Sequence, residues 1–234
     1  MQPFVIPIYS AYHILMIKIH INSGGLAETN AYLIADEKTK IAAIIDAPES
    51  TTASLLAIAH QHHYDVQYLI LTHGHFDHIS DHAVVTGAFP KAKVLIHKLD
   101  EPKLQKPDSA VFELDYEIPP RSADAYLEDG DKIHIGQLTF SIMHTPGHSP
   151  GHVVLYSVDH ALLFSGDLLM AGGVGRYDLA DGDIEILKKS LRRVLLLPDK
   201  TKVLSGHGPG TTIGHERAAN YFIREHNLGD VRFG

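Results

Sequence analysis

The sequence predicts an α+β protein in which two β-sheets pack against each other and helices cover them. The strands predicted early in the chain come in hairpins, whereas the later ones alternate with helical segments. A single doubly wound parallel sheet would instead alternate strand and helix throughout. Hydrophobic residues make up 44% of the 234 residues, so the chain has enough apolar side chains for a sizeable core.

The predicted strands are short apolar runs. Residues 16–22 alternate isoleucines with polar side chains, which is the period of a half-buried strand. Residues 31–35 and 41–46 flank the polar segment DEKTK, a pattern that predicts a hairpin. Six further segments are typical of buried strands, namely residues 66–71, 93–96, 138–143, 152–157, 161–165 and 202–205.

Two segments predict long helices. Residues 51–62 are rich in Ala and Leu, and residues 183–197 place apolar side chains at helical spacing with Lys and Arg on the opposite face. Residues 100–127 lack a clear period and predict a long loop with a short helix. We expect one domain over residues 1–234, with an N-terminal extension over residues 1–15 and a short helical tail after about residue 210.

Composition excludes several classes of protein. The 20 basic and 28 acidic residues give a net charge of −8, so no nucleic-acid partner is expected. No apolar stretch approaches the roughly 20 residues that span a bilayer, and the first residues lack the basic region of a signal peptide. We therefore expect a cytoplasmic protein without a membrane partner. Without cysteine, the chain has no disulfide, no thiolate metal ligand and no cysteine nucleophile.

The segment THGHFDH, residues 72–78, gathers His73, His75, Asp77 and His78 directly after a predicted buried strand. Clustered histidines bring no advantage in packing, but each is a metal ligand at neutral pH. Three more polar clusters follow predicted strands, and loops at one set of strand ends can bring distant side chains together. These clusters are HTPGHSPGH with His144, SGDLL with Asp167 and GHGPG with His207.

In this order and spacing, the motifs resemble those of the metallo-β-lactamase superfamily over about residues 30–220. The resemblance implies an αββα sandwich with a dinuclear metal site at one edge. It implies a first metal on His73, His75 and His144, a second metal on Asp77, His78 and His207, and Asp167 as the bridge between them. The resemblance makes Asp77 and Asp167 the candidate catalytic carboxylates, whereas His148 is expected to support the ligand shell without binding metal.

The metal site implies the chemistry. Nitrogen and oxygen ligands suit two Zn²⁺ ions, with iron or manganese as alternatives. Two cations that share a water lower its pKa toward ~7, and the resulting hydroxide can attack an electrophilic carbonyl.

The segment GDLLMAGGVGRYDLADGD, residues 166–183, is similar to that of the short bacterial members of the glyoxalase II group. This group hydrolyses small-molecule thioesters, such as S-2-hydroxyacylglutathione to glutathione and a 2-hydroxy acid. The resemblance implies that Arg176 and Tyr177 face the substrate, with Arg176 as a partner for a carboxylate. The alternative for Arg176 is a structural ion pair with Asp178 or Asp181.

Three other functions have some support in the sequence. A persulfide dioxygenase shares the same segment and would use a single iron on His73, His144 and Asp167. A lactonase also carries the HTPGHSPGH pattern, but the segment GGVGR argues against it. A metal-storage module is disfavoured, because metal storage does not require Asp167, His207 or a substrate loop.

Overall fold

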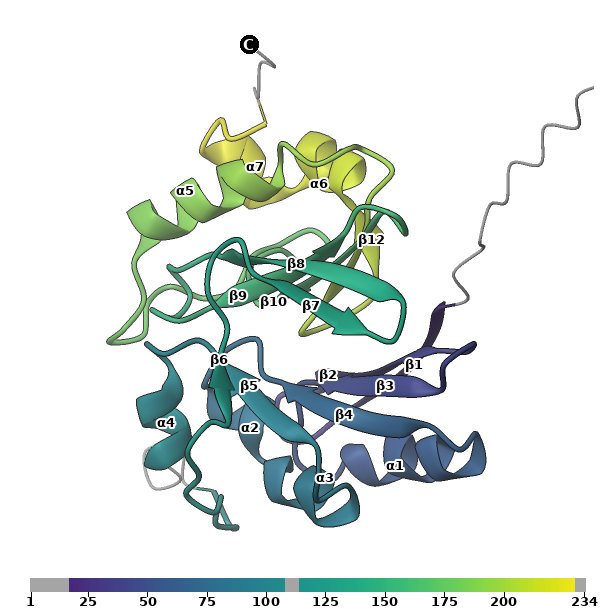
Figure 1. Ribbon diagram of the computed structural model, residues 1–234. Coiled ribbons are helices and arrows are strands. Elements are labelled where there is room, and N and C mark those ends of the chain that lie inside the picture. Colours follow the sequence, from purple (N-terminus) through teal and green to yellow (C-terminus); the bar gives the residue numbers. More distant parts are fainter. Residues whose placement is uncertain (1–16, 108–113, 230–234) are drawn as a thin grey trace, which may run out of the picture.

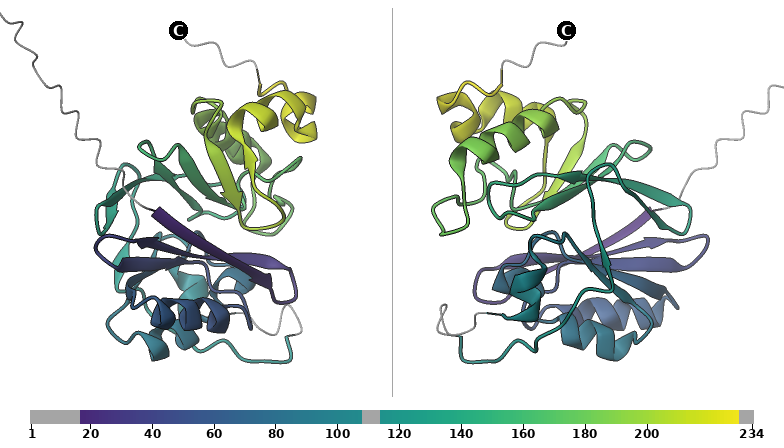
Figure 2. Two further views of the ribbon diagram at one scale, coloured as in Figure 1. Left: turned by 90° about the vertical axis from the view of Figure 1, so that its right-hand side faces the viewer. Right: turned by 60° about the vertical axis from the view of Figure 1, so that its left-hand side comes forward.

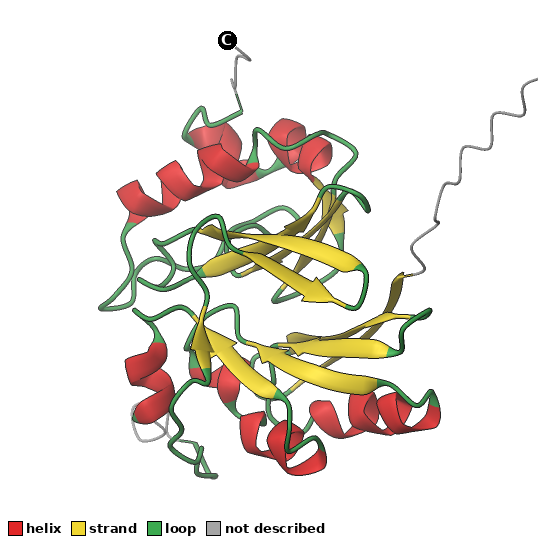
Figure 3. Cartoon of the chain, viewed as in Figure 1, coloured by secondary structure: helices red, strands yellow, loops and turns green. Residues whose placement is uncertain are grey.

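The computed structural model describes residues 17–107 and 114–229 and places two β-sheets face to face between two layers of helices (Figures 1 and 3). Within these residues each sheet has six strands, in the orders β1-β2-β3-β4-β5-β6 and β12-β11-β10-β9-β8-β7. Both sheets combine antiparallel and parallel pairs. The predicted α+β sandwich is therefore confirmed. The extension predicted for residues 1–15 lies outside the described residues.

The first sheet comes from the N-terminal half of the chain. Its first three strands pair antiparallel, and β3 to β6 pair in parallel. Helices cover the parallel strands, since a parallel connection has to carry the chain back across the sheet. The elements are β1 (Ile17–Gly24), β2 (Thr29–Asp36), β3 (Ile41–Ile45), α1 (Thr52–Gln61), β4 (Asp65–Ile70), α2 (Phe76–Ile79), α3 (His82–Ala88), β5 (Lys93–Ile96), α4 (Glu101–Gln105) and β6 (Ala125–Tyr126).

The second sheet comes from the C-terminal half. Four strands form an antiparallel meander from β7 to β10, and α5 then leads to β11, which pairs with β10 in parallel. Two short helices follow residue 210. The elements are β7 (Lys132–Ile135), β8 (Leu138–His144), β9 (Val153–Ser157), β10 (Leu162–Gly166), α5 (Ile184–Val194), β11 (Lys202–Ser205), β12 (Thr211–Thr212), α6 (Ile213–Ala219) and α7 (Tyr221–Glu225).

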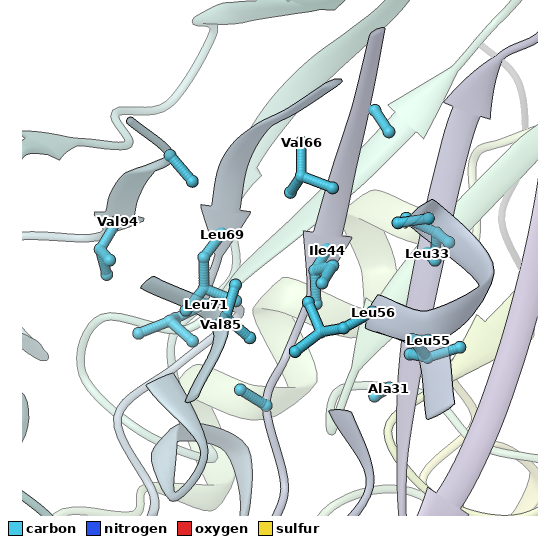
Figure 4. Close-up of a cluster of buried hydrophobic side chains, with 14 of the residues drawn as sticks. Ala31, Leu33, Ile44, Leu55, Leu56, Val66, Leu69, Leu71, Val85 and Val94 are labelled. Atoms are coloured by element: carbon cyan, nitrogen blue, oxygen red, sulfur yellow. The ribbon is translucent and has the colours of Figure 1, made fainter. Parts of the chain in front are cut away.

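Strand β2 is buried on both faces, which explains its continuous apolar sequence. Successive side chains point to opposite faces of a strand. Leu33 therefore packs with Leu55 of α1 in a cluster between the first sheet and its helices (Figure 4). Tyr32 and Ile34 lie in a second cluster between the two sheets. A third cluster fills the space between the second sheet and helices α5 to α7, which Figure 2 shows on the outer face of the sandwich.

Helix α5 forms as its sequence predicts. Asp183 caps it, because its side chain accepts hydrogen bonds from the backbone N–H groups of Glu185 and Ile186. Leu187 and Leu191 then enter the third cluster. Residues 100–127 contain the short strand β6 besides the expected loop and the short helix α4. No helix in the described part of the chain is long and apolar enough to cross a bilayer.

Backbone hydrogen bonds join the two sheets along one edge. The N–H of Val153, at the start of β9, donates to the carbonyl of Thr72 after β4 over 2.9 Å. The N–H of Asn30 in β2 donates to the carbonyl of Gly206 after β11 over 2.7 Å. The Tyr32 hydroxyl adds a bond of 2.7 Å to the carbonyl of Ser205. The loops that follow β4 and β11 are therefore fixed relative to each other.

The cluster between the sheets should dominate the free energy of unfolding. Phe140 on β8 is fully buried there, so Phe140→Ala should lower this free energy by about 3–5 kcal/mol. Val158 is 70% exposed, and Val158→Ala should change it by less than about 0.5 kcal/mol. Chemical denaturation at equal metal content measures both changes. Equal losses in the two variants would contradict this assignment of the core.

Candidate metal centre

Four loops bring most of the predicted site residues to the edge where the two sheets are joined. Carboxyl ends of neighbouring parallel strands meet at one edge of a sheet, as those of β3 and β4 do in the first sheet and those of β10 and β11 in the second. The side chains that meet are His73 and His75 after β4, Asp77 and His78 on α2, His148 between β8 and β9, Asp167 after β10 and His207 after β11.

Three histidines form the first cluster. The Nδ1 atom of His75 lies 3.1 Å from Nε2 of His73 and 2.9 Å from Nε2 of His148, and these two Nε2 atoms are 3.1 Å apart. Ligands on a tetrahedral zinc with Zn–N bonds of 2.0–2.1 Å are about 3.4 Å apart. Burial lowers the pKa of His148 to about 4, so its ring is neutral and can offer a lone pair.

The second cluster combines Asp77, His78 and His207. The Oδ2 atom of Asp77 lies 3.4 Å from Nε2 of His78 and 3.4 Å from Nε2 of His207. The Thr29 hydroxyl donates to the same carboxylate oxygen over 2.6 Å and fixes its orientation. These two separations match the edge of a tetrahedral site.

Asp167 lies between the two clusters. Its Oδ2 atom is 3.4 Å from Nε2 of His148 in the first cluster and 3.2 Å from Nε2 of His207 in the second. Its Oδ1 atom is 3.4 Å from Nε2 of His78. Both Oδ1 of Asp167 and Nε2 of His78 are buried without a hydrogen-bond partner in the described part of the chain. Buried polar atoms without partners are costly, and a cation at this point would satisfy both.

In four histidines the Nδ1 atom, called the rear nitrogen because it faces away from the clusters, forms a hydrogen bond. The Nε2 lone pair of each ring can therefore face the clusters. Nδ1 of His148 donates to the carbonyl of Arg176 over 2.7 Å, and Nδ1 of His207 donates to the carbonyl of Ala27 over 3.0 Å. Support of this kind orients metal-binding histidines in proteins.

The other two histidines share one carboxylate behind them. Nδ1 of His78 donates to Oδ2 of Asp46 over 2.8 Å. The Thr72 hydroxyl donates to the same carboxylate oxygen over 2.8 Å and accepts from Nδ1 of His73 over 3.1 Å. Asp46 therefore links both clusters, although the sequence analysis did not identify it. Asp46 ends the predicted strand over residues 41–46, a position that by itself indicates no role at the site.

Charges within the site reinforce one another. Burial disfavours the charged form of His78, but the Asp77, Asp167 and Asp46 carboxylates outweigh burial and raise its pKa. Burial alone would raise the pKa of Asp167, yet His78 and His207 hold it well below its usual value. The site therefore strongly favours positive charge near Asp167.

The prediction that His144 binds the first metal is wrong for this structure, because its side chain lies outside both clusters. Its Nε2 atom donates to the carbonyl of Pro150 over 2.8 Å, and its ring stacks on that of His97 with centroids 4.0 Å apart. His148, expected only to support the ligands, occupies the position in the first cluster. The chain leaves β8 at His144 and then forms a loop whose residue 148 reaches the cluster.

His152 supports Asp167 from behind. The backbone N–H of Asp167 donates to Nε2 of His152 over 2.9 Å. Two glycines make room around Asp167: a Cβ atom on Gly206 would lie 2.1 Å from Oδ1 of Asp167, and one on Gly175 would lie 1.9 Å from its carbonyl oxygen. A larger residue at either position would displace Asp167.

Asp100 holds the loops of the first cluster together. Its fully buried carboxylate accepts hydrogen bonds from the backbone of Gly74 over 2.8 Å, from the backbone of Gly151 over 2.7 Å and from the hydroxyl of Ser149 over 2.6 Å. Gly74 lies between the first two ligands, and Ser149 follows His148. No local pattern in the sequence indicates this role.

A cavity of about 290 Å³ lies beside the clusters, and its described lining residues are Ala27, His75, Phe76, Asp77, His148, Asp167, Met170, Val174, Gly175, Arg176, Leu179 and His207. The guanidinium of Arg176 forms a bidentate pair with Asp178 at 2.8 and 3.0 Å, which is the structural alternative expected from the sequence. Tyr177 does not line this cavity. Its ring packs near Phe222 in the third hydrophobic cluster, so the structure gives no support to its predicted contact with substrate.

A sequence model of the metallo-beta-lactamase superfamily matches residues 24–207, a range that contains both clusters. The chain belongs to the metallo-beta-lactamase superfamily. Within this superfamily it is similar to hydroxyacylglutathione hydrolase GloC from Haemophilus influenzae. The two are 34% identical over 205 residues, which cover 84% of this chain and 93% of GloC.

Solved structures in the superfamily share the fold. The B3 metallo-beta-lactamase BLEG-1 matches this chain with a TM-score of 0.80 and 36% sequence identity. The match covers 89% of this chain and 99% of the BLEG-1 chain. The structure of TTHA1623 in a di-iron-bound form matches this chain with a TM-score of 0.76 and 38% sequence identity. The match covers 87% of this chain and 99% of the TTHA1623 chain. Since one fold hosts many reactions, the substrate has to be argued from the site.

The contrast between His148 and His144 can be measured directly. His148→Ala should lose the metal of the first cluster, about one ion per chain, because it removes one of three nitrogens that meet there. His144→Ala should keep the full metal content, because its ring binds Pro150 and His97 instead. Elemental analysis after gel filtration counts the ions, and thermal melting shows that both variants are folded. Metal loss in His144→Ala with retention in His148→Ala would restore the original assignment.

Proposed function

We propose that the chain is a thioester hydrolase with a centre of two divalent metal ions, and that S-2-hydroxyacylglutathiones represent its substrate class. The supporting observation concerns proton donors. Of the described titratable side chains that line the cavity, all except Arg176 belong to the two clusters or, like Asp167, lie between them as a proposed ligand. None of them is left over to protonate a leaving group.

A thiolate leaves without help from an acid, because a thiol has a pKa of about 8.5. An amine or an alcohol is a far stronger base and needs a proton as it departs. The absence of a spare acid among the described lining residues therefore favours a thioester over an amide or an ordinary ester. The similarity to GloC, a hydroxyacylglutathione hydrolase at 34% identity, supports the same choice.

The metal ligands in this proposal are the residues whose atoms meet. His73, His75 and His148 would hold the first ion, Asp77, His78 and His207 the second, and Asp167 both. Bound there, divalent ions supply a water of lowered pKa and a counter-charge for the developing oxyanion. Zn²⁺ suits these nitrogen and oxygen ligands, and the di-iron form of TTHA1623 supports iron as the alternative.

The chain's own side chains prepare the cavity. Thr29 keeps the Asp77 carboxylate turned toward the histidines. Asp46 and Thr72 keep the rear nitrogens of His78 and His73 protonated. Arg176 lines the cavity, and its pair with Asp178 is exposed, with side-chain exposures of 59% and 64%. Exposed pairs contribute at most about 1 kcal/mol, so a glutathione carboxylate can replace Asp178 as the partner.

A persulfide dioxygenase is the second candidate, because Asp167 lies beside two histidines of the first cluster. Two histidines and one carboxylate are the ligands of iron oxygenases. With His144 outside the site, that set would be His73, His148 and Asp167.

Substrate assays on metal-defined protein separate the two candidates. S-Lactoylglutathione should be hydrolysed with release of free thiol, and removal of metal with a chelator should abolish this activity. Added Zn²⁺, Fe²⁺ or Mn²⁺ should restore it, and Asp167→Asn should remain inactive. Oxygen uptake that depends on glutathione persulfide, without release of thiol from the thioester, would instead support the oxygenase.

A further inference from the structure

A second cavity lies next to the metal centre and has a different character. Its volume is about 480 Å³, within the range of small-molecule sites. Its lining comes from α2, from α4 and from the segment that precedes α5, and Figure 1 shows α4 and this segment on the left of the molecule. The described residues that line this α4 cavity are Gly74, His75, Phe76, Ile79, Pro102, Lys103, Lys106, Pro107, Leu179, Ala180 and Asp181.

The α4 cavity adjoins the cavity at the metal centre. His75, Phe76 and Leu179 line both, so the two spaces are neighbours. His75 presents Nδ1 to the first cluster, while its Nε2 atom lies 3.9 Å from Oδ2 of Asp181 on the side of the α4 cavity. A substrate whose reacting carbonyl lies at the metal centre can therefore extend one substituent past Phe76.

Two of the three charged side chains among the described lining residues of the α4 cavity, Lys103 and Asp181, form an ion pair. Nζ of Lys103 lies 2.5 Å from Oδ2 of Asp181, and this ion pair joins α4 to the segment before α5. Because Lys103 and Asp181 neutralise each other and Lys106 is exposed to solvent, a ligand here need not supply a charge. Phe76, Ile79, Leu179 and the prolines give the remaining wall an apolar surface.

We propose that the α4 cavity binds an apolar acyl chain, and that the substrates are thioesters whose acyl group is longer and more apolar than lactoyl. This inference rests on the proposed thioester hydrolysis. The acyl side of the substrate is the one that fits, because glutathione carries two carboxylates, an ammonium group and two amide groups. Placing those groups against an apolar wall would leave them without hydrogen bonds.

A series of substrates tests the proposal. In S-(2-hydroxyacyl)glutathiones that lengthen from lactoyl to 2-hydroxyoctanoyl, each added methylene should raise kcat/KM about fourfold until the cavity is filled. Ala180→Trp places an indole in the cavity and should reduce the ratio of kcat/KM between the longest and the shortest substrate to near one. Ala180 is an exposed residue outside the two ligand clusters, so the variant should fold and bind metal.

Ala53→Trp is the matched control. Ala53 is exposed on α1 and lines neither cavity, so this variant should keep the wild-type dependence on chain length. A wild-type series without dependence on chain length would overturn the proposal. The same dependence in Ala180→Trp and in Ala53→Trp would also overturn it.

Binding of simple carboxylates tests the cavity without any hydrolysis. Calorimetry on the metal-loaded protein should show octanoate binding about two hundredfold more tightly than butanoate, and Ala180→Trp should remove this difference. If no thioester is hydrolysed but this difference is found, the proposed reaction fails and the apolar site stands. If thioesters are hydrolysed but octanoate binds no more tightly than butanoate, the reaction stands and the apolar site is excluded.

Discussion

The geometry of the candidate metal centre depends on the electrostatic contact of Asp167 with histidines of both clusters. Asp167 and His148 come from the second sheet, whereas His73 and His78 come from the first. The site therefore exists only when the two sheets are packed in one fixed relation. The hydrogen bond between Val153 and Thr72 and the hydrophobic cluster between the sheets maintain that relation. Function and stability are thus coupled through the same interface.

Two further buried carboxylates, Asp46 and Asp100, hold the ligands of the candidate site in place. Asp46 connects the rear of His78 to Thr72, and Asp100 connects the loop of Gly74 to the loop of Ser149. Each of these carboxylates is buried and accepts several hydrogen bonds, which offsets the cost of removing its charge from water. Partners of this kind hold ligands within the narrow tolerance that metal binding requires.

The sequence predicts the fold and most of the site because these depend on local patterns. Alternation, hairpin signals and the amphipathic period of α5 identify the sandwich, and the spacing within residues 72–78 identifies four of the side chains that meet. The error at His144 has a simple cause. His144, His148 and His152 are evenly spaced, so only the path of the loop after β8 decides which one enters the cluster. Asp46, Asp100 and the packing of Tyr177 depend on contacts between distant segments, which no local pattern encodes.

The central claim is that two ions share Asp167 at the junction of the sheets. Anomalous diffraction from crystals of the metal-loaded protein, recorded at the absorption edge of the bound metal, locates each ion directly. The account predicts two peaks per chain, one beside His73, His75 and His148 and one beside Asp77, His78 and His207, with Asp167 in contact with both. A single peak at full occupancy, or a peak beside His144, would contradict it.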